Sequence, residues 1–171
     1  MHNKNSILAT AKRTLETESK AIANLINALD DSFAHAVQHI YNAQGRVVIS
    51  GVGKSAIIAS KMVATFNSTG TPAIFMHAAD AIHGDLGTIQ KNDVVICLSK
   101  SGNTAEIKAL IPLIKSGKNK LIGITGNMDS ILAKQSDFVL NTYVEKEACH
   151  NNLAPTSRTS AQLAMGDALA I

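Results

Sequence analysis

The sequence predicts an α/β fold, built on one open, doubly wound parallel sheet of about five strands with a helical N-terminal extension. Five short, nearly continuous apolar runs follow residue 45, and a helical segment separates each run from the next. Such runs are typical of parallel strands that helices cover on both faces. The length of 171 residues, without a linker or an internal repeat, fits a single domain over 1–171.

Two helices are predicted ahead of the sheet, within residues 1–44. Apolar residues recur at helical spacing over 6–29, and no turn residue interrupts them. Asp30 then offers an N-cap for a second helix, which Gly45 ends. Residues 45–171 are therefore expected to form the α/β core.

The core is expected to alternate strands and helices. The predicted strands are the runs at 46–50, 72–76, 93–99, 120–125 and 137–140. The predicted helices lie at about 55–68, 78–84, 104–116 and 129–135, and a last one opens near Thr156. That helix runs to Ile171 without a glycine cap, so we expect the sequence to be a fragment or a trimmed domain.

The amino-acid composition argues against several classes of function. Hydrophobic residues make up 46% and charged residues 17%, with a formal net charge of +3, as in a soluble globular domain. Aromatic residues are only 4%, so stacking platforms for nucleic acid are not expected. No apolar stretch approaches the ~18 residues of a membrane span. Two cysteines, Cys97 and Cys149, and an N-terminus without a signal sequence predict a cytoplasmic protein.

The loop after the first strand, residues 50–56, is the first candidate site. Its G-x-G-x-x-A pattern formally matches a dinucleotide fingerprint, but the acid expected about 20 residues later is missing, since the first one is Asp80. Gly53, Lys54 and Ser55 instead offer backbone amides, an ammonium and a hydroxyl to an anion at a helix N-terminus. The alternative is a plain strand-to-helix turn with an exposed lysine.

The loop after the third strand offers several hydrogen-bond donors close together. It contains Ser99, Ser101, Asn103 and Thr104. With the free amides of the following helix, these side chains suit a phosphate monoester. The alternative is a simple helix cap, for which one hydroxyl suffices. Glu106 lies in the first helical turn, where it either complements the helix dipole or acts as a general acid or base.

Two further candidates are a carboxylate and a histidine. Glu147 lies in the long loop 145–157 after the fifth strand and is a candidate second carboxylate, with a solvated loop acid as the alternative. His83 follows the second strand among glycines and is either a site residue or structural. His35 and His39 have the spacing of metal ligands but no carboxylate nearby, so we expect no metal site.

At these residues the sequence resembles the sugar isomerase (SIS) superfamily, and within it the bacterial D-arabinose 5-phosphate isomerases that begin the synthesis of the octulosonic acid sugar Kdo. The segments that carry the resemblance are GVGKSAIIASKMVATFNSTGTP (51–72), HGDLG (83–87), LSKSGNTAEI (98–107) and KEACHNNLAPTSRTSAQLAMGDALA (146–170). The third segment alone marks a phosphosugar-binding domain, and the others are more specific. The resemblance implies a flavodoxin-like three-layer sandwich.

The resemblance also implies an activity. It implies interconversion of D-ribulose 5-phosphate and D-arabinose 5-phosphate through an enediol or enediolate, without metal or cofactor, as the first step of Kdo and lipopolysaccharide or capsule synthesis. Such a reaction needs a base, an acid and a group that stabilises the enediolate. By resemblance, Lys54 stabilises the reacting oxygens, Glu106 and Glu147 exchange protons, and His83 assists ring opening. The implied substrate-binding residues are Gly53, Ser55, Ser99, Ser101, Asn103 and Thr104 for the phosphate, and Thr71 on the sugar side.

Family members also carry a histidine in a downstream Ser-His-Pro-Gly-Gly stretch and commonly two CBS modules, and the 171 residues contain neither. The resemblance implies a homotetramer and leaves open a nucleotide-sugar feedback ligand. A non-catalytic phosphosugar-binding or regulatory SIS domain is the second hypothesis, which a conversion assay separates from the first. A nicotinamide-dependent enzyme is the third, which stabilisation by NAD would favour.

Overall fold

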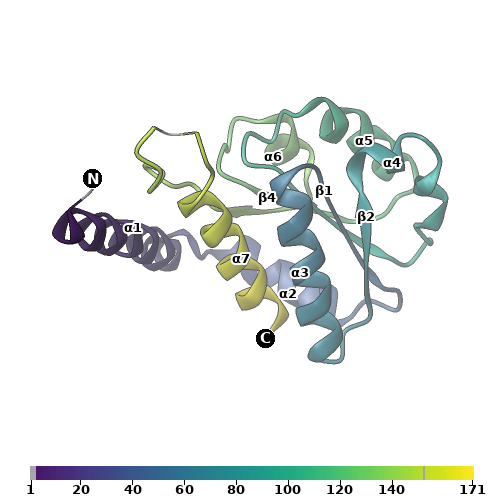
Figure 1. Cartoon of the computed structure of the whole chain (residues 1–171). Coiled ribbons are helices and arrows are strands. Elements are labelled where there is room, and N and C mark those ends of the chain that lie inside the picture. Colours follow the sequence, from purple (N-terminus) through teal and green to yellow (C-terminus); the bar gives the residue numbers. More distant parts are fainter. Residues whose placement is uncertain (1–2, 152) are drawn as a thin grey trace.

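Five parallel strands form the centre of the molecule, in the order β2-β1-β3-β4-β5 (Figure 1). They are β1 (Val47–Gly51), β2 (Ala73–His77), β3 (Val94–Leu98), β4 (Leu121–Thr125) and β5 (Phe138–Asn141). The computed structural model describes residues 3–151 and 153–171, so Asn152 of the 146–170 segment lies outside the described residues. All five predicted strands are confirmed. Every residue of β1, β3 and β4 is buried, which explains their continuous apolar runs.

Helices cover both faces of the sheet (Figure 1). They are α1 (Lys4–Asn24), α2 (Asp31–Tyr41), α3 (Lys54–Ser68), α4 (Ala78–Ala81), α5 (Ala105–Ser116), α6 (Ile131–Gln135) and α7 (Ser157–Ala170). Side chains of β1 alternate between the two faces, since Val47 and Ile49 join a core with α2, α3 and α7. Val48 instead joins the core that contains α5 and Leu132 of α6. This is the predicted three-layer sandwich.

Helix α1 projects from the sandwich and packs along α7 (Figure 1). The prediction of one unbroken helix over 6–29 is wrong at its end, because α1 stops at Asn24 and a 3-10 turn, Leu25–Ala28, follows. The turn brings Leu25 into the core, where it is only 7% exposed. Asp30 then caps α2 as predicted, since its carboxylate accepts hydrogen bonds from the first amides of that helix.

The predicted helix at 78–84 is too long. Helix α4 ends at Ala81, and a 3-10 turn follows at Asp85–Thr88. The His83 amide donates to the carbonyl of Asp80, three residues back, which tightens the chain away from the α-helical spacing. His83 therefore lies in a turn beyond the carboxyl end of β2.

The strand order reverses between β1 and β3. The chain leaves β1 to form β2 on one side and then returns to form β3 on the other side. The loops after β1 and β3 therefore diverge from one point of the carboxyl edge, which is where ligands bind in open α/β sheets. Within the part of the chain that the structure describes, no helix has the length and hydropathy needed to span a membrane.

Candidate active site

The turn from β1 into α3 forms the first part of the site. Gly53 precedes α3 with a φ of +59°, and Lys54 is the exposed first residue of this 15-residue helix. The Ser55 hydroxyl donates a hydrogen bond to Oε1 of Gln162 on α7, at 3.2 Å. The turn thus offers an ammonium and helix N-terminal amides to an anion, while Ser55 is already connected to α7.

The loop after β3 is shaped by its own polar side chains. The buried Ser99 hydroxyl oxygen accepts a hydrogen bond from the Gly102 amide at 3.1 Å. The Ser101 hydroxyl oxygen accepts one from the Asn103 amide at 3.2 Å. Asn103 Oδ1 accepts one from the Ile131 amide at 3.1 Å, which joins the loop to α6. Three of the four predicted phosphate-binding side chains therefore also build the loop.

Thr104 is the fourth predicted phosphate-binding residue of this loop. It precedes the 12-residue α5 but makes no capping hydrogen bond with its side chain. Within the described residues, its buried hydroxyl has no hydrogen-bond partner. Such a group destabilises the fold by about 1–3 kcal/mol unless a partner arrives. A phosphate oxygen at the N-terminus of α5 would be that partner, and the half-buried Glu106 lies in the same first turn.

Glu147 caps α7 from outside the helix. Its Oε2 accepts hydrogen bonds from the Thr156 amide at 2.7 Å and from the Thr156 hydroxyl at 3.1 Å. Its Oε1 accepts one from Nε of Arg158. Burial raises the pKa of Glu147, but the hydrogen bonds from Arg158 and Thr156 outweigh burial and hold the pKa below its ordinary value. Glu147 is thus a carboxylate already bound to protein donors, rather than one turned toward a substrate as predicted.

The remaining predicted site residues lie on opposite edges of the sheet. His83 is exposed and lies beyond the carboxyl end of β2, on the edge that carries the two loops. Thr71 precedes β2 and so lies at the amino end of the strands. There it lines a 480 Å³ cavity with Tyr41 and Leu169. Within one copy of the chain, the structure does not bring Thr71 together with the other predicted residues.

A cavity of 340 Å³ lies beside the loop after β3 (residues 99–104), which we call the phosphate loop after its predicted ligand, at the carboxyl ends of β3, β4 and β5. Ser101 and Arg158 line it, together with Lys100 and Asn127. Asn127 Nδ2 donates a hydrogen bond to the Ser101 carbonyl at 3.3 Å. Sequence reasoning missed both residues. Arg158 lies within the 146–170 segment but was given no role, Asn127 lies in none of the quoted segments, and only the path of the loops brings them here.

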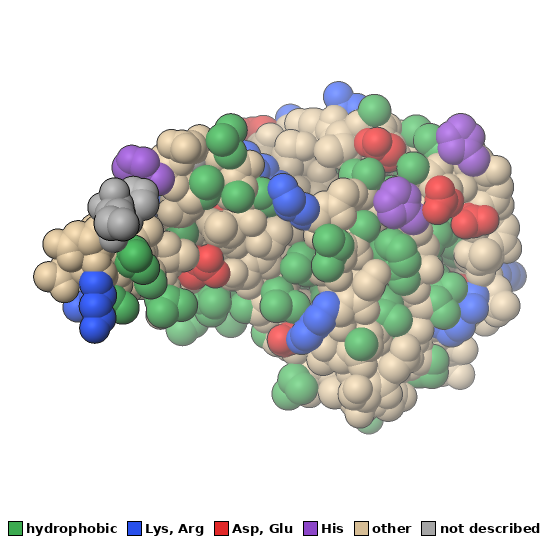
Figure 2. Space-filling model, viewed as in Figure 1, with side chains coloured by type: hydrophobic (Ala, Val, Ile, Leu, Met, Phe, Trp, Pro, Cys, Tyr) green, Lys and Arg blue, Asp and Glu red, His purple; other side chains and the backbone are tan. Residues whose placement is uncertain are grey.

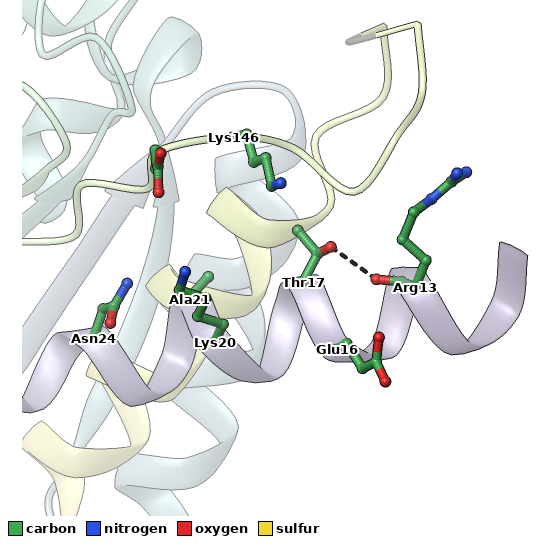
Figure 3. Close-up of a pocket in the computed structure, with 8 residues that line it drawn as sticks. Arg13, Glu16, Thr17, Lys20, Ala21, Asn24 and Lys146 are labelled. Carbon is green, nitrogen blue, oxygen red and sulfur yellow. Dashed lines mark hydrogen bonds between the residues drawn. The ribbon is translucent and has the colours of Figure 1, made fainter. Parts of the chain in front are cut away.

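A second groove, of 270 Å³, lies between α1 and the loop after β5 (Figure 3). Lys146 reaches from the loop toward α1, while Glu16 points away from the groove. None of the predicted catalytic residues lines it. Among the described residues, no group of three or more His, Cys, Asp or Glu side chains could hold a metal ion. His39 packs against the ring of Phe138, with centroids 5.6 Å apart.

Comparison with known sequences agrees with this geometry. A family model described as the SIS domain matches residues 39–171. The arabinose 5-phosphate isomerase KdsD of Francisella tularensis is 48% identical over 169 residues, which cover 97% of this chain and 52% of the relative. KdsD of Pseudomonas aeruginosa is 49% identical over 162 residues, which cover 95% of this chain and 50% of the relative. The chain thus spans about half the length of these curated relatives.

Comparison with solved structures gives the same family. An Escherichia coli CFT073 protein, solved in complex with arabinose 5-phosphate, superimposes with a TM-score of 0.94 and is 42% identical. The match covers 99% of this chain and 90% of that one. The family model covers most of the chain, and the fold and the loops after β1 and β3 agree with it. The chain therefore belongs to the SIS domain family.

Proposed function

We propose that the chain is the isomerase domain of an arabinose 5-phosphate isomerase, which interconverts D-ribulose 5-phosphate and D-arabinose 5-phosphate through an enediol or enediolate. The observation that carries the proposal is the loop after β3, which ends at the N-terminus of α5 with the Thr104 hydroxyl, a group that has no hydrogen-bond partner among the described residues. The names of the relatives and the sugar phosphate bound in the Escherichia coli structure support the choice of sugar. The proposal places the reaction at the first step of Kdo and lipopolysaccharide or capsule synthesis, in the cytoplasm.

The phosphate would be held at the N-terminus of α5. The Ser101 oxygen accepts a bond within the loop, but its hydroxyl proton remains available to a phosphate oxygen. Thr104 would donate the second hydroxyl proton, and the first amides of α5 would add to both. Ser99 and Asn103 support the bound phosphate by holding the loop in shape. Gly53 and Ser55 complete the binding site from the turn after β1.

The reacting carbons would lie between the loops after β1 and β3. In this proposal Lys54 stabilises the enediolate oxygens, because an ammonium compensates charge that develops in the transition state. Glu106 takes the proton from one carbon, exchanges it with solvent and donates a solvent proton to the other carbon, since a carboxylate can act as base and then as acid. His83 assists ring opening. Glu147 contributes to the site from the start of α7, where its carboxylate accepts hydrogen bonds from Thr156 and Arg158.

A conversion assay tests the proposal. The protein is incubated with ribulose 5-phosphate in D₂O, and NMR should show arabinose 5-phosphate carrying deuterium at C2. Lys54→Ala and Glu106→Gln should each lower kcat by about 100-fold or more. Lys108→Ala, which removes an exposed lysine of α5, is the matched control. Binding of the sugar phosphate without conversion would overturn the isomerase and favour a phosphosugar-binding domain.

The proposal includes assembly into a homotetramer. Helix α1 exposes large apolar side chains, which Figure 2 shows in green along the projecting part of the molecule. On α1 they are Ile7, Leu8, Leu15 and Ile22, and the 3-10 turn that follows adds Ile26, each 41–71% exposed. An apolar surface of this kind is typical of a subunit interface. A nucleotide-activated sugar from later in the pathway, added to the conversion assay, tests for a feedback ligand.

A further inference from the structure

Protein donors occupy both oxygens of the Glu147 carboxylate. Oε2 accepts three hydrogen bonds, from the amide and hydroxyl of Thr156 and from the Arg158 amide at 3.5 Å. Oε1 accepts one from the Arg158 guanidinium. The Glu147 side chain is only 2% exposed, and that of Arg158 is 25% exposed. The carboxylate is therefore bound on both oxygens and shielded from solvent.

The same contacts close the loop after β5 onto the start of α7. Thr156 precedes α7 but makes no capping bond with its own side chain, so Glu147 supplies the acceptor for the first amides of the helix. The Thr156 hydroxyl accepts in turn from the Ala148 amide at 2.9 Å. A negative charge at a helix N-terminus stabilises the helix. Removing one partner of a buried ion pair destabilises the protein, because the other charge is left buried and unpaired. Hydrogen bonds thus join Glu147, Thr156 and Arg158 into one unit, which fixes the loop after β5 to the start of α7. We call these three residues the α7 latch.

The α7 latch is connected to both parts of the candidate site. Arg158 lines the cavity that Ser101 of the phosphate loop also lines. Gln162, one helical turn after Arg158 on the same face of α7, accepts the hydrogen bond from Ser55. A displacement of the start of α7 would therefore alter the wall beside the phosphate loop and the support of Ser55 together.

We propose that Glu147 and Arg158 are positioning residues, which fix the loop after β5 and the start of α7 at the reaction site, and that Glu147 exchanges no proton with the sugar. The inference rests on the proposed function, and it assigns the proton exchange to the other carboxylate, Glu106. Arg158 is the new residue in this assignment. Its task is to hold Glu147 in the capping position.

A double-mutant cycle in the whole chain tests the α7 latch. Glu147→Gln, Arg158→Gln and the double variant should all lower kcat by a similar factor of about 10, because each breaks the same unit. The KM for the sugar phosphate should change by less than about 3-fold, and Arg158→Lys should restore part of kcat. Deuterium uptake per turnover should persist in Glu147→Gln. A loss of this uptake, or a fall in kcat as large as in Glu106→Gln, would overturn the proposal.

Hydrogen exchange separates this inference from the proposed function. In Arg158→Gln the amides of Thr156 and Arg158 should exchange faster, while thermal unfolding shows that the domain remains folded. Lys12→Gln and Glu16→Gln, which break an exposed ion pair on α1, are the matched controls and should leave both exchange and kcat unchanged. Failure of the parent chain to isomerise the sugar would overturn the proposed function, and the exchange result would still decide the latch. Unchanged exchange at Thr156 in Arg158→Gln would overturn the latch even in an active enzyme.

Discussion

Gly102 of the phosphate loop faces Ser130 so closely that a Cβ on Gly102 would lie 2.1 Å from the Ser130 hydroxyl oxygen. Gly102 also has a φ of +62°, which side chains disfavour. Ser130 cannot move away easily, because it donates to the Asn127 carbonyl and accepts from the Ala133 amide at the start of α6. The phosphate loop thus lies directly on a fixed helix cap.

Gly102→Ala should therefore damage both binding and stability. We expect a loss of about 2–4 kcal/mol in the free energy of unfolding, from clash and backbone strain together. We also expect at least about 10-fold weaker binding of a sugar phosphate. Ser130→Gly supplies the control background, because it removes the Oγ and Cβ that the new methyl group would meet. There Gly102→Ala should cost only about 1 kcal/mol, from backbone strain, so equal losses in the two backgrounds in urea unfolding would contradict the role of Ser130.

Gly166→Ala should loosen the packing of α7 on α3. The added Cβ would lie 2.5 Å from Cγ of Met62, which is fully buried. We expect the free energy of unfolding to fall by about 1–3 kcal/mol through overpacking. In a Met62→Ala background the same substitution should cost almost nothing, because the methionine that it meets is gone. Additive losses in the double variant would show that this contact is not the cause.

Asp137 should make stability depend on acid pH. Burial raises its pKa, but hydrogen bonds from Lys120, the Leu121 amide and Lys115 outweigh burial and lower the pKa from 3.8 to about 2. The stabilisation is therefore complete above about pH 4 and disappears as the pH falls through about 2. Asp137→Asn should lower the free energy of unfolding by about 1 kcal/mol at pH 7 and by much less at pH 2. An equal loss at both pH values in urea unfolding would contradict this account.

Leu15→Glu should weaken assembly without unfolding the domain. Leu15 is 71% exposed on α1, so a charge there costs little in a single chain but much in an apolar interface. Light scattering should show a smaller mass than for the parent, with an unchanged circular dichroism spectrum. Lys12→Glu, on the same helix and already charged, is the control. An unchanged mass for Leu15→Glu would exclude this part of α1 from the interface.

Local patterns of apolar residues in the sequence were sufficient to predict most of the fold. Continuous apolar runs predicted the five strands because a parallel sheet buries both faces of each strand. The end of α1 was not predictable in this way, since the apolar spacing continues through the 3-10 turn to Leu29 and only the core contact of Leu25 favours the turn. The short α4 was missed for a similar reason, because i to i+3 hydrogen bonds leave no periodic signal in so few residues.

The parts of the candidate site that are built from residues close together in the sequence were predictable. The parts that depend on residues far apart in the sequence were not. The loops after β1 and β3 carry their polar groups within one turn, and the parallel topology brings both loops to one edge. Glu147 and Arg158 are eleven positions apart, and the described residues between Glu147 and α7 form no helix or strand, so their pairing depends on the path of the loop. Thr71 was placed with the sugar, but the strand direction puts it at the opposite edge.

The hydrogen bond from the Ser160 hydroxyl to Glu18, at 2.6 Å, joins helices that are 142 positions apart. During synthesis, α1 emerges from the ribosome well before α7, and its partner is absent until the residues between the two helices have been translated. The sheet, whose first three strands are adjacent in space, can begin to assemble in that interval. Helix α1 would then dock only when α7 has formed, so its attachment reports that the last helix of this domain has folded.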